Sequence, residues 1–111
     1  MSESKIQEET RKNDVDFQLE NGETVRLRLN FARLKILEKL NFELFERFNK
    51  INYGKSENII DLATIVYVAY WCANYDGINK IYSEDEFVEL VPFDVIEIQR
   101  VQNALMKPKK K

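Results

Sequence analysis

Apolar and polar side chains alternate along two segments near the start of the chain, residues 15–19 and 25–29. A period of two is typical of strands that bury one face and expose the other. The two segments are close enough in sequence to form an antiparallel hairpin. Its buried face is expected to carry five apolar side chains: Val15, Phe17, Val25, Leu27 and Leu29.

The turn between these segments decides which residues face each other. A two-residue loop would pair Phe17 with Arg26 and place a charge on the apolar face. A three-residue loop, residues 20–22, pairs Phe17 with Val25 instead. It also puts Gly22 at the third loop position, which a type I turn followed by a bulge requires to be left-handed. The sequence therefore predicts the three-residue loop.

Beyond the hairpin, apolar residues recur every three positions, close to the period of a helix. Segments 31–40 and 42–51 show this pattern, either as two helices or as one helix with a bend near Asn41. Asn30 precedes the first segment and is expected to cap it. Gly54 is expected to end the second segment in a left-handed conformation.

Two further helices are indicated near the end of the chain. Ser83 and Glu86 match a capping box, which predicts a short helix through Leu90. Pro92 suits the first turn of a last helix. One side of that helix carries Val95, Ile98, Val101, Gln102 and Leu105.

The most apolar segment lies in the middle, in a helix predicted over about residues 57–75 with Ser56 at its start. Residues 65–73 include no charge and no amide, so the helix is apolar all round at its centre. A membrane span needs about 20 apolar residues. Polar residues interrupt this run at both ends, so it is too short to cross a membrane.

Two interpretations of this helix remain open. In the first, the hairpin and the other helices surround it. In the second, one side faces a partner, because tyrosine and tryptophan combine apolar area with a polar tip and are enriched at interfaces. That side carries Thr64 and four candidate partner-binding residues: Ile60, Tyr67, Trp71 and Tyr75.

Length and charge limit the possible domain organisation and the possible partners. The chain of 111 residues suits one domain, predicted over residues 14–106 between a flexible charged arm (1–13) and a basic tail (107–111). The fold class expected is mostly helical α+β, a hairpin packed on four to five helices around the central one. A net charge of −2 gives no overall attraction to nucleic acid or to an anionic membrane.

The chain offers little for catalysis. It has no histidine and a single cysteine, Cys72, inside the apolar run, where we expect an inert side chain. The acidic residues 84–86 lack the spacing of a calcium loop and suit the first turn of a helix. Four cations, Arg26, Arg28, Arg33 and Lys35, are expected on an outer face. We therefore expect no enzyme activity, no cofactor and no metal.

Taken in order, these features resemble the tail assembly chaperones of long-tailed, siphovirus-type bacteriophages. The resemblance covers residues 15–106. It rests on the succession of hairpin, helical pair, apolar helix, turn at residues 76–77, capped acidic helix and closing helix. It rests also on one motif after the hairpin turn: Leu27-Arg28-Leu29-Asn30-Phe31 followed by Leu34-Lys35.

The resemblance implies a function through protein contacts. Such chaperones bind the tape measure protein, keep it soluble and promote tail tube assembly with the tail tube protein. It further implies a homo-oligomer in the cytoplasm of the bacterial host, absent from the mature virion, and a longer form made by frameshifting near the terminal lysines. Two alternatives remain: a small helical regulator or adaptor, and a head–tail structural component.

Overall fold

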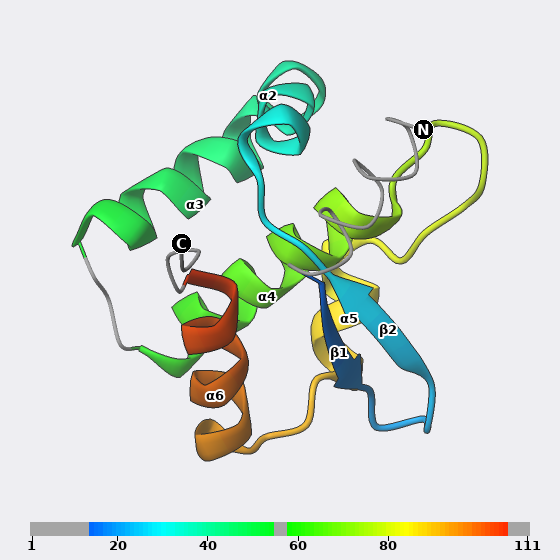
Figure 1. The fold of residues 1–111 in the computed structure, drawn as a ribbon, viewed down its shortest axis with the longest axis vertical. Helices are drawn as coiled ribbons and strands as arrows, with labels where there is room; N and C mark the ends of the chain where they lie inside the picture. The colour runs from blue at the N-terminus through cyan, green and yellow to red at the C-terminus, as the bar shows by residue number, and fades with distance from the viewer. Residues whose placement is uncertain (1–13, 55–57, 107–111) are drawn as a thin grey trace, which may run out of the picture.

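The computed structural model describes residues 14–54 and 58–106 (Figure 1). The predicted flexible arm (1–13) and basic tail (107–111) lie outside the described residues. The elements follow in this order: β1 (Val15–Gln18), β2 (Thr24–Leu27), α2 (Phe31–Leu40), α3 (Phe42–Gly54), α4 (Ile59–Asn74), α5 (Glu84–Leu90) and α6 (Val95–Met106). The predicted fold class, a mostly helical α+β protein with an N-terminal hairpin, is confirmed.

The hairpin has the predicted register. Phe17 pairs with Val25, and the pairing continues along both strands. At the turn, the Leu19 N–H donates to the Glu23 carbonyl oxygen over 2.8 Å. Gly22 has a φ of 91°, so it takes the left-handed conformation that this loop requires. The alternation of side chains and the glycine together determine the register.

Helix α4 lies at the centre of the molecule and contacts β2, α2, α3, α5 and α6. Residues 64–72 are all buried, which explains why the sequence there is apolar on every side. The helix begins at Ile59, where the Asn58 side chain accepts hydrogen bonds from two backbone N–H groups. The predicted start at Ser56 lies outside the described residues, and Asn58 is the N-cap.

Two predictions about helix ends are corrected. Gly54 is the last residue of α3, but it does not adopt the predicted positive φ. Pro92 precedes α6 rather than opening it. The Asp94 side chain accepts from the Glu97 N–H over 3.1 Å, and the Asp94 carbonyl accepts from the Ile98 N–H over 3.0 Å. Asp94 therefore caps the helix, two residues after the proline.

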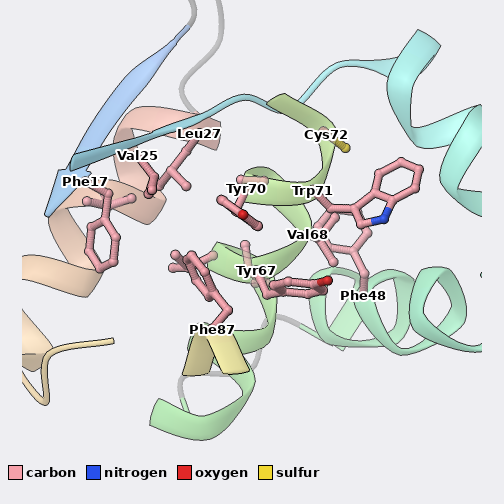
Figure 2. Close-up of a cluster of buried hydrophobic side chains, with 14 of the residues drawn as sticks. Phe17, Val25, Leu27, Phe48, Tyr67, Val68, Tyr70, Trp71, Cys72 and Phe87 are labelled. Carbon is pink, nitrogen blue, oxygen red and sulfur yellow. The ribbon is translucent and has the colours of Figure 1, made fainter. Parts of the chain in front are cut away.

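An aromatic cluster joins α4 to α5 (Figure 2). The Phe87 ring stacks on Tyr70 at 4.6 Å and lies 5.5 Å from Tyr67. The two tyrosine hydroxyls bind one stretch of backbone: Tyr67 donates to the Tyr82 carbonyl and Tyr70 accepts from the Tyr82 N–H, both over 2.9 Å. The polar tips of these tyrosines therefore fix the segment that leads into α5.

Burial of Cys72 makes the stability of the protein sensitive to alkali. Burial raises the pKa of this thiol from about 9 to about 12. Between these values the unfolded chain has lost the proton while the native protein retains it, so stability is intact below pH 9 and falls as the pH rises. We expect a fall of roughly 1.4 kcal/mol for each pH unit in this window. Urea unfolding at a series of pH values measures it.

The matched variant for this measurement is Cys72→Ala. Tyr67, whose pKa burial raises from 10 to about 12, still titrates in the variant. The variant should therefore keep a smaller fall in stability that begins near pH 10. Equal slopes for the variant and the parent protein between pH 9 and pH 10 would contradict the role given to the thiol.

Candidate functional site

Asn41 lies at the sharp bend between α2 and α3 and bonds to both helices. The Asn41 N–H donates to the Leu37 carbonyl over 2.7 Å and ends α2. The Asn41 side-chain oxygen accepts from the Leu44 N–H over 3.2 Å and caps the start of α3. Of the two alternatives left open by the sequence, the structure shows two separate helices that meet at Asn41. The two helices diverge here, and the end of α6 lies below α3 in the view of Figure 1.

An apolar groove with a volume of about 700 Å³ is lined by side chains of α2, α3 and the end of α6. We call it the α2–α3 groove. Phe48 is buried beneath it, Leu34 and Phe45 are half-buried in its walls, and Phe31 at its rim is 86% exposed. The complete lining is Leu29, Asn30, Phe31, Leu34, Lys35, Glu38, Phe45, Phe48, Asn49, Asn52, Leu105 and Met106.

The polar members of this lining stand beside the apolar ones. Asn49 and Asn52 bring amide groups from α3, and Lys35 and Glu38 bring one charge of each sign from α2. An apolar floor with a few polar groups at its edges suits an amphipathic helix, whose apolar stripe enters the groove while its polar residues meet the edges. These side chains can bind such a segment by contact and hydrogen bonding.

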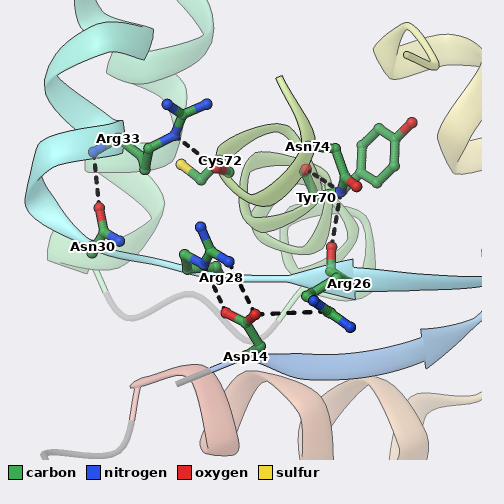
Figure 3. A network of polar contacts seen from close by, with 8 residues as sticks. All are labelled: Asp14, Arg26, Arg28, Asn30, Arg33, Tyr70, Cys72 and Asn74. Atoms are coloured by element: carbon green, nitrogen blue, oxygen red, sulfur yellow. Dashed lines mark hydrogen bonds and ion pairs between the residues drawn. The ribbon is translucent and has the colours of Figure 1, made fainter. Parts of the chain in front are cut away.

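Helix α2, which forms one wall of the groove, is tied to α4 by Arg33 (Figure 3). The Arg33 Nε donates to the Cys72 carbonyl over 2.9 Å, and a terminal nitrogen donates to the Tyr75 carbonyl. Both carbonyls belong to the C-terminal end of α4, where the helix dipole favours a positive charge. The guanidinium therefore satisfies two carbonyl groups and fixes the position of α2.

Replacing Arg33 by alanine is expected to lower the free energy of unfolding by about 1–3 kcal/mol, because two charge-assisted hydrogen bonds are lost. Arg33→Lys keeps the charge but not the two-nitrogen geometry of the guanidinium, so its stability should lie between those of the parent protein and Arg33→Ala. Urea unfolding of the three proteins gives their free energies of unfolding. In Arg33→Ala, hydrogen exchange of the backbone amides should accelerate most in α2. Equal stability of all three would mean that α2 is held by packing alone.

The candidate partner-binding residues do not lie together on a surface. Tyr67 and Trp71 are buried, Tyr75 is half-buried against Trp71, and Ile60 is 72% exposed. Within this chain Tyr67 and Trp71 therefore belong to the core, which agrees with the first of the two interpretations left open by the sequence. The aromatic cluster covers Tyr67, and Trp71 points toward α2 and α3, where Phe48 lies (Figure 2).

The groove itself was not predicted, although the sequence holds a signal for it. Four apolar residues of segment 31–40, at positions 31, 34, 37 and 40, are spaced by three, so each is rotated by about 300° from the one before. Together they spread over half the circumference of the helix, which is wider than one packed side. Accordingly Leu37 in the middle is buried, whereas Phe31 at one end is exposed.

Most of the predicted basic group is used within the molecule. Asp14 accepts two hydrogen bonds from Arg28, at 2.7 and 3.0 Å, and lies 3.6 Å from Arg26 (Figure 3). Arg33 binds the carbonyls of α4, which leaves Lys35 beside the groove. Arg26 and Lys35 are exposed as expected, whereas Arg28 and Arg33 are half-buried and bonded within the molecule, so the expectation is corrected for these two.

Two acidic residues of α5, Glu84 and Glu86, have structural roles. Glu86 and Ser83 form the predicted capping box, and both of its hydrogen bonds are present. Glu84 binds Arg47 through two hydrogen bonds of 2.7 and 3.0 Å. In the part of the chain that the structure describes, no three histidine, cysteine or acidic residues are placed to hold a metal ion.

Comparison of the chain with protein-family models, curated proteins and solved structures gives no match. Within residues 14–54 and 58–106, no helix has both the length and the apolarity to cross a membrane. Function is therefore inferred from the groove and from the order of the elements along the chain.

Proposed function

We propose that the protein is a tail assembly chaperone of a long-tailed bacteriophage and binds a helical segment of the tape measure protein in the α2–α3 groove. The observation that carries this proposal is the groove itself, an open apolar channel of about 700 Å³ with Phe31 exposed at its rim. The order of the elements, hairpin first and the apolar helix at the centre, agrees with the resemblance drawn from the sequence.

The chemistry of the groove suits this role. A tape measure protein is long and helical, and before assembly its apolar stripe faces water. A groove with an apolar floor and polar edges covers such a stripe through contacts that use no unique side-chain partner. Successive segments of one long helix can therefore bind several copies of the chaperone. In this role the protein keeps the tape measure protein soluble and promotes tail tube assembly with the tail tube protein.

The test uses the long helical protein encoded immediately downstream, co-expressed with the chaperone. Phe31→Glu places a charge at the rim of the groove on a side chain that is already exposed, so the fold should survive. The matched control is Ile78→Glu, because Ile78 is 87% exposed and does not line the groove. We expect Phe31→Glu to weaken binding by a factor on the order of 10 or more. The control should bind like the parent protein.

Equal binding by both variants would contradict the proposed site. The place of action gives a second test, because a chaperone acts in the cytoplasm of the bacterial host and leaves the finished tail. Antibody against the protein should detect it in lysates of producing cells and not in purified mature particles. Stoichiometric amounts in mature particles would instead favour a structural component of the virion.

A further inference from the structure

A second apolar surface lies away from the α2–α3 groove. It is a hollow with a volume of about 350 Å³ between the first turns of α4, helix α5 and the connection to α6. We call it the α4–α5 hollow. Ile98 is buried at its floor, and Ile60 and Phe93 are exposed at its edges, Phe93 by 84%. Single exposed apolar side chains are ordinary, but two beside an apolar hollow indicate a docking surface.

The edge of this hollow is acidic. Asp85 lines it, and Glu89 lies one helical turn later on the same side of α5. Both side chains are exposed, and neither forms an ion pair within residues 14–54 and 58–106. Glu84 also lines the hollow, but Arg47 neutralises its charge. Two uncompensated carboxylates therefore stand beside an apolar surface.

The acidic character extends beyond these two residues. Over residues 83–106 the sequence carries six acidic residues and one cation: Glu84, Asp85, Glu86, Glu89, Asp94, Glu97 and Arg100. Complementary potentials favour association and like charges oppose it. The charge around the hollow therefore selects an occupant that brings cations.

The apolar lining limits the backbone conformation of the occupant. Most residues that line the hollow are apolar: Ile59, Ile60, Ala63, Val88, Val91, Pro92, Phe93 and Ile98. A segment that presses on such a surface must satisfy its own backbone N–H and C=O groups. A helix does so through its internal hydrogen bonds, whereas an extended segment does not. A helix with one apolar stripe bordered by cations therefore fits both the lining and the edge.

We propose that the α4–α5 hollow is the docking site of a basic amphipathic helix of a second protein. The apolar stripe of this helix covers Ile60 and Phe93, and its lysine or arginine side chains lie near Asp85 and Glu89. No residue lines both the hollow and the α2–α3 groove. In Figure 1, α2 is at the top of the view and the α5–α6 connection at the bottom. The proposal therefore does not depend on what the groove binds.

The test uses two synthetic amphipathic peptides of about 18 residues, long enough to form a helix on the protein. Both carry the same leucine stripe, and they differ only in whether lysine or glutamate borders it. Phe31→Glu is the starting protein, because an intact groove could bind the same peptides. We expect the lysine peptide to bind at least about 10-fold more tightly than the glutamate peptide. Its largest backbone amide shifts in nuclear magnetic resonance spectra should lie in the first turns of α4, in α5 and in residues 91–98.

Two variants of the starting protein separate the apolar contact from the charge. Phe93→Ser removes an exposed apolar side chain without a change of charge, and Asp85→Lys reverses one charge. Each should weaken binding of the lysine peptide by a factor on the order of 10. The matched controls are Ile78→Ser and Asp16→Lys, since both positions are exposed and neither lines the hollow. Both controls should bind the lysine peptide like the starting protein.

Four results would overturn the proposal. Equal binding of the two peptides would remove the selection by charge, and undiminished binding by Phe93→Ser would remove the apolar contact. Equal losses in Asp16→Lys and Asp85→Lys would reduce the effect to the overall charge of the protein. Shifts of the same amides when the protein alone is concentrated would assign the hollow to a second copy of the chain. None of these results bears on the groove, whose test is the binding of the downstream protein by Phe31→Glu.

Discussion

Trp71→Glu is expected to leave no folded protein at 25 °C. Trp71 is 7% exposed and stacks on Tyr75 with ring centroids 4.4 Å apart and planes 7° apart. The change removes a large apolar side chain from the core and places a carboxylate in its buried position. We expect a loss of about 5 kcal/mol or more, comparable to the whole stability of a typical domain. Far-UV circular dichroism and urea unfolding measure it.

The matched control lies on the same helix. Ile60→Glu changes an exposed side chain in the first turn of α4, so its effect on stability should stay within about 0.5 kcal/mol. Both variants introduce the same charge, and only the burial of the position differs. If Trp71→Glu kept the native spectrum and lost only partner binding, Trp71 would be an interface residue rather than a core residue.

The different burial of Trp71 and Ile60 shows what the apolar pattern along α4 cannot predict. A helix with one apolar stripe tells which side faces the core, and the hairpin register was predicted in the same way, from alternation around Phe17 and Val25. A helix that is apolar all round carries no such signal. Which sides of such a helix are buried depends on how many other helices and strands pack against it, and this is determined by the tertiary structure.

The tyrosines of α4 show a second limit. A tyrosine in an apolar run suits an interface, because its hydroxyl needs a polar partner. Tyr67 and Tyr70 find that partner inside the molecule, on the backbone of Tyr82. The contacts span 15 and 12 residues along the chain, so no local pattern predicts them. Residue type alone therefore did not separate the core from an interface.

The candidate site was the least predictable feature. Its walls come from the ends of elements distant in sequence, with Phe31 on α2 and Leu105 on α6. Whether they enclose a groove depends on the angle that Asn41 imposes and on where α6 ends. The spread of apolar residues around α2 indicates surplus apolar surface, but it does not indicate what that surface faces.

Phe87→Ala is expected to lower the free energy of unfolding by about 3–5 kcal/mol, since it leaves a cavity among aromatic rings. Phe87 is the buried residue of α5, a helix of seven residues, and its ring contacts Tyr67 and Tyr70. A helix this short is not stable alone, so its attachment to the core depends on this side chain. Hydrogen exchange should therefore show that α5 loses more protection than α4.

The comparison variant is Phe87→Leu, which keeps most of the apolar volume and should cost about 1.5 kcal/mol. Urea unfolding of the three proteins gives the differences directly. Two other contacts fasten α5: the capping box at Ser83 and the ion pair between Glu84 and Arg47. The ion pair is partly exposed and contributes about 1 kcal/mol or less. A loss below about 1 kcal/mol in Phe87→Ala would mean that these polar contacts, and not the aromatic ring, hold α5 on the core.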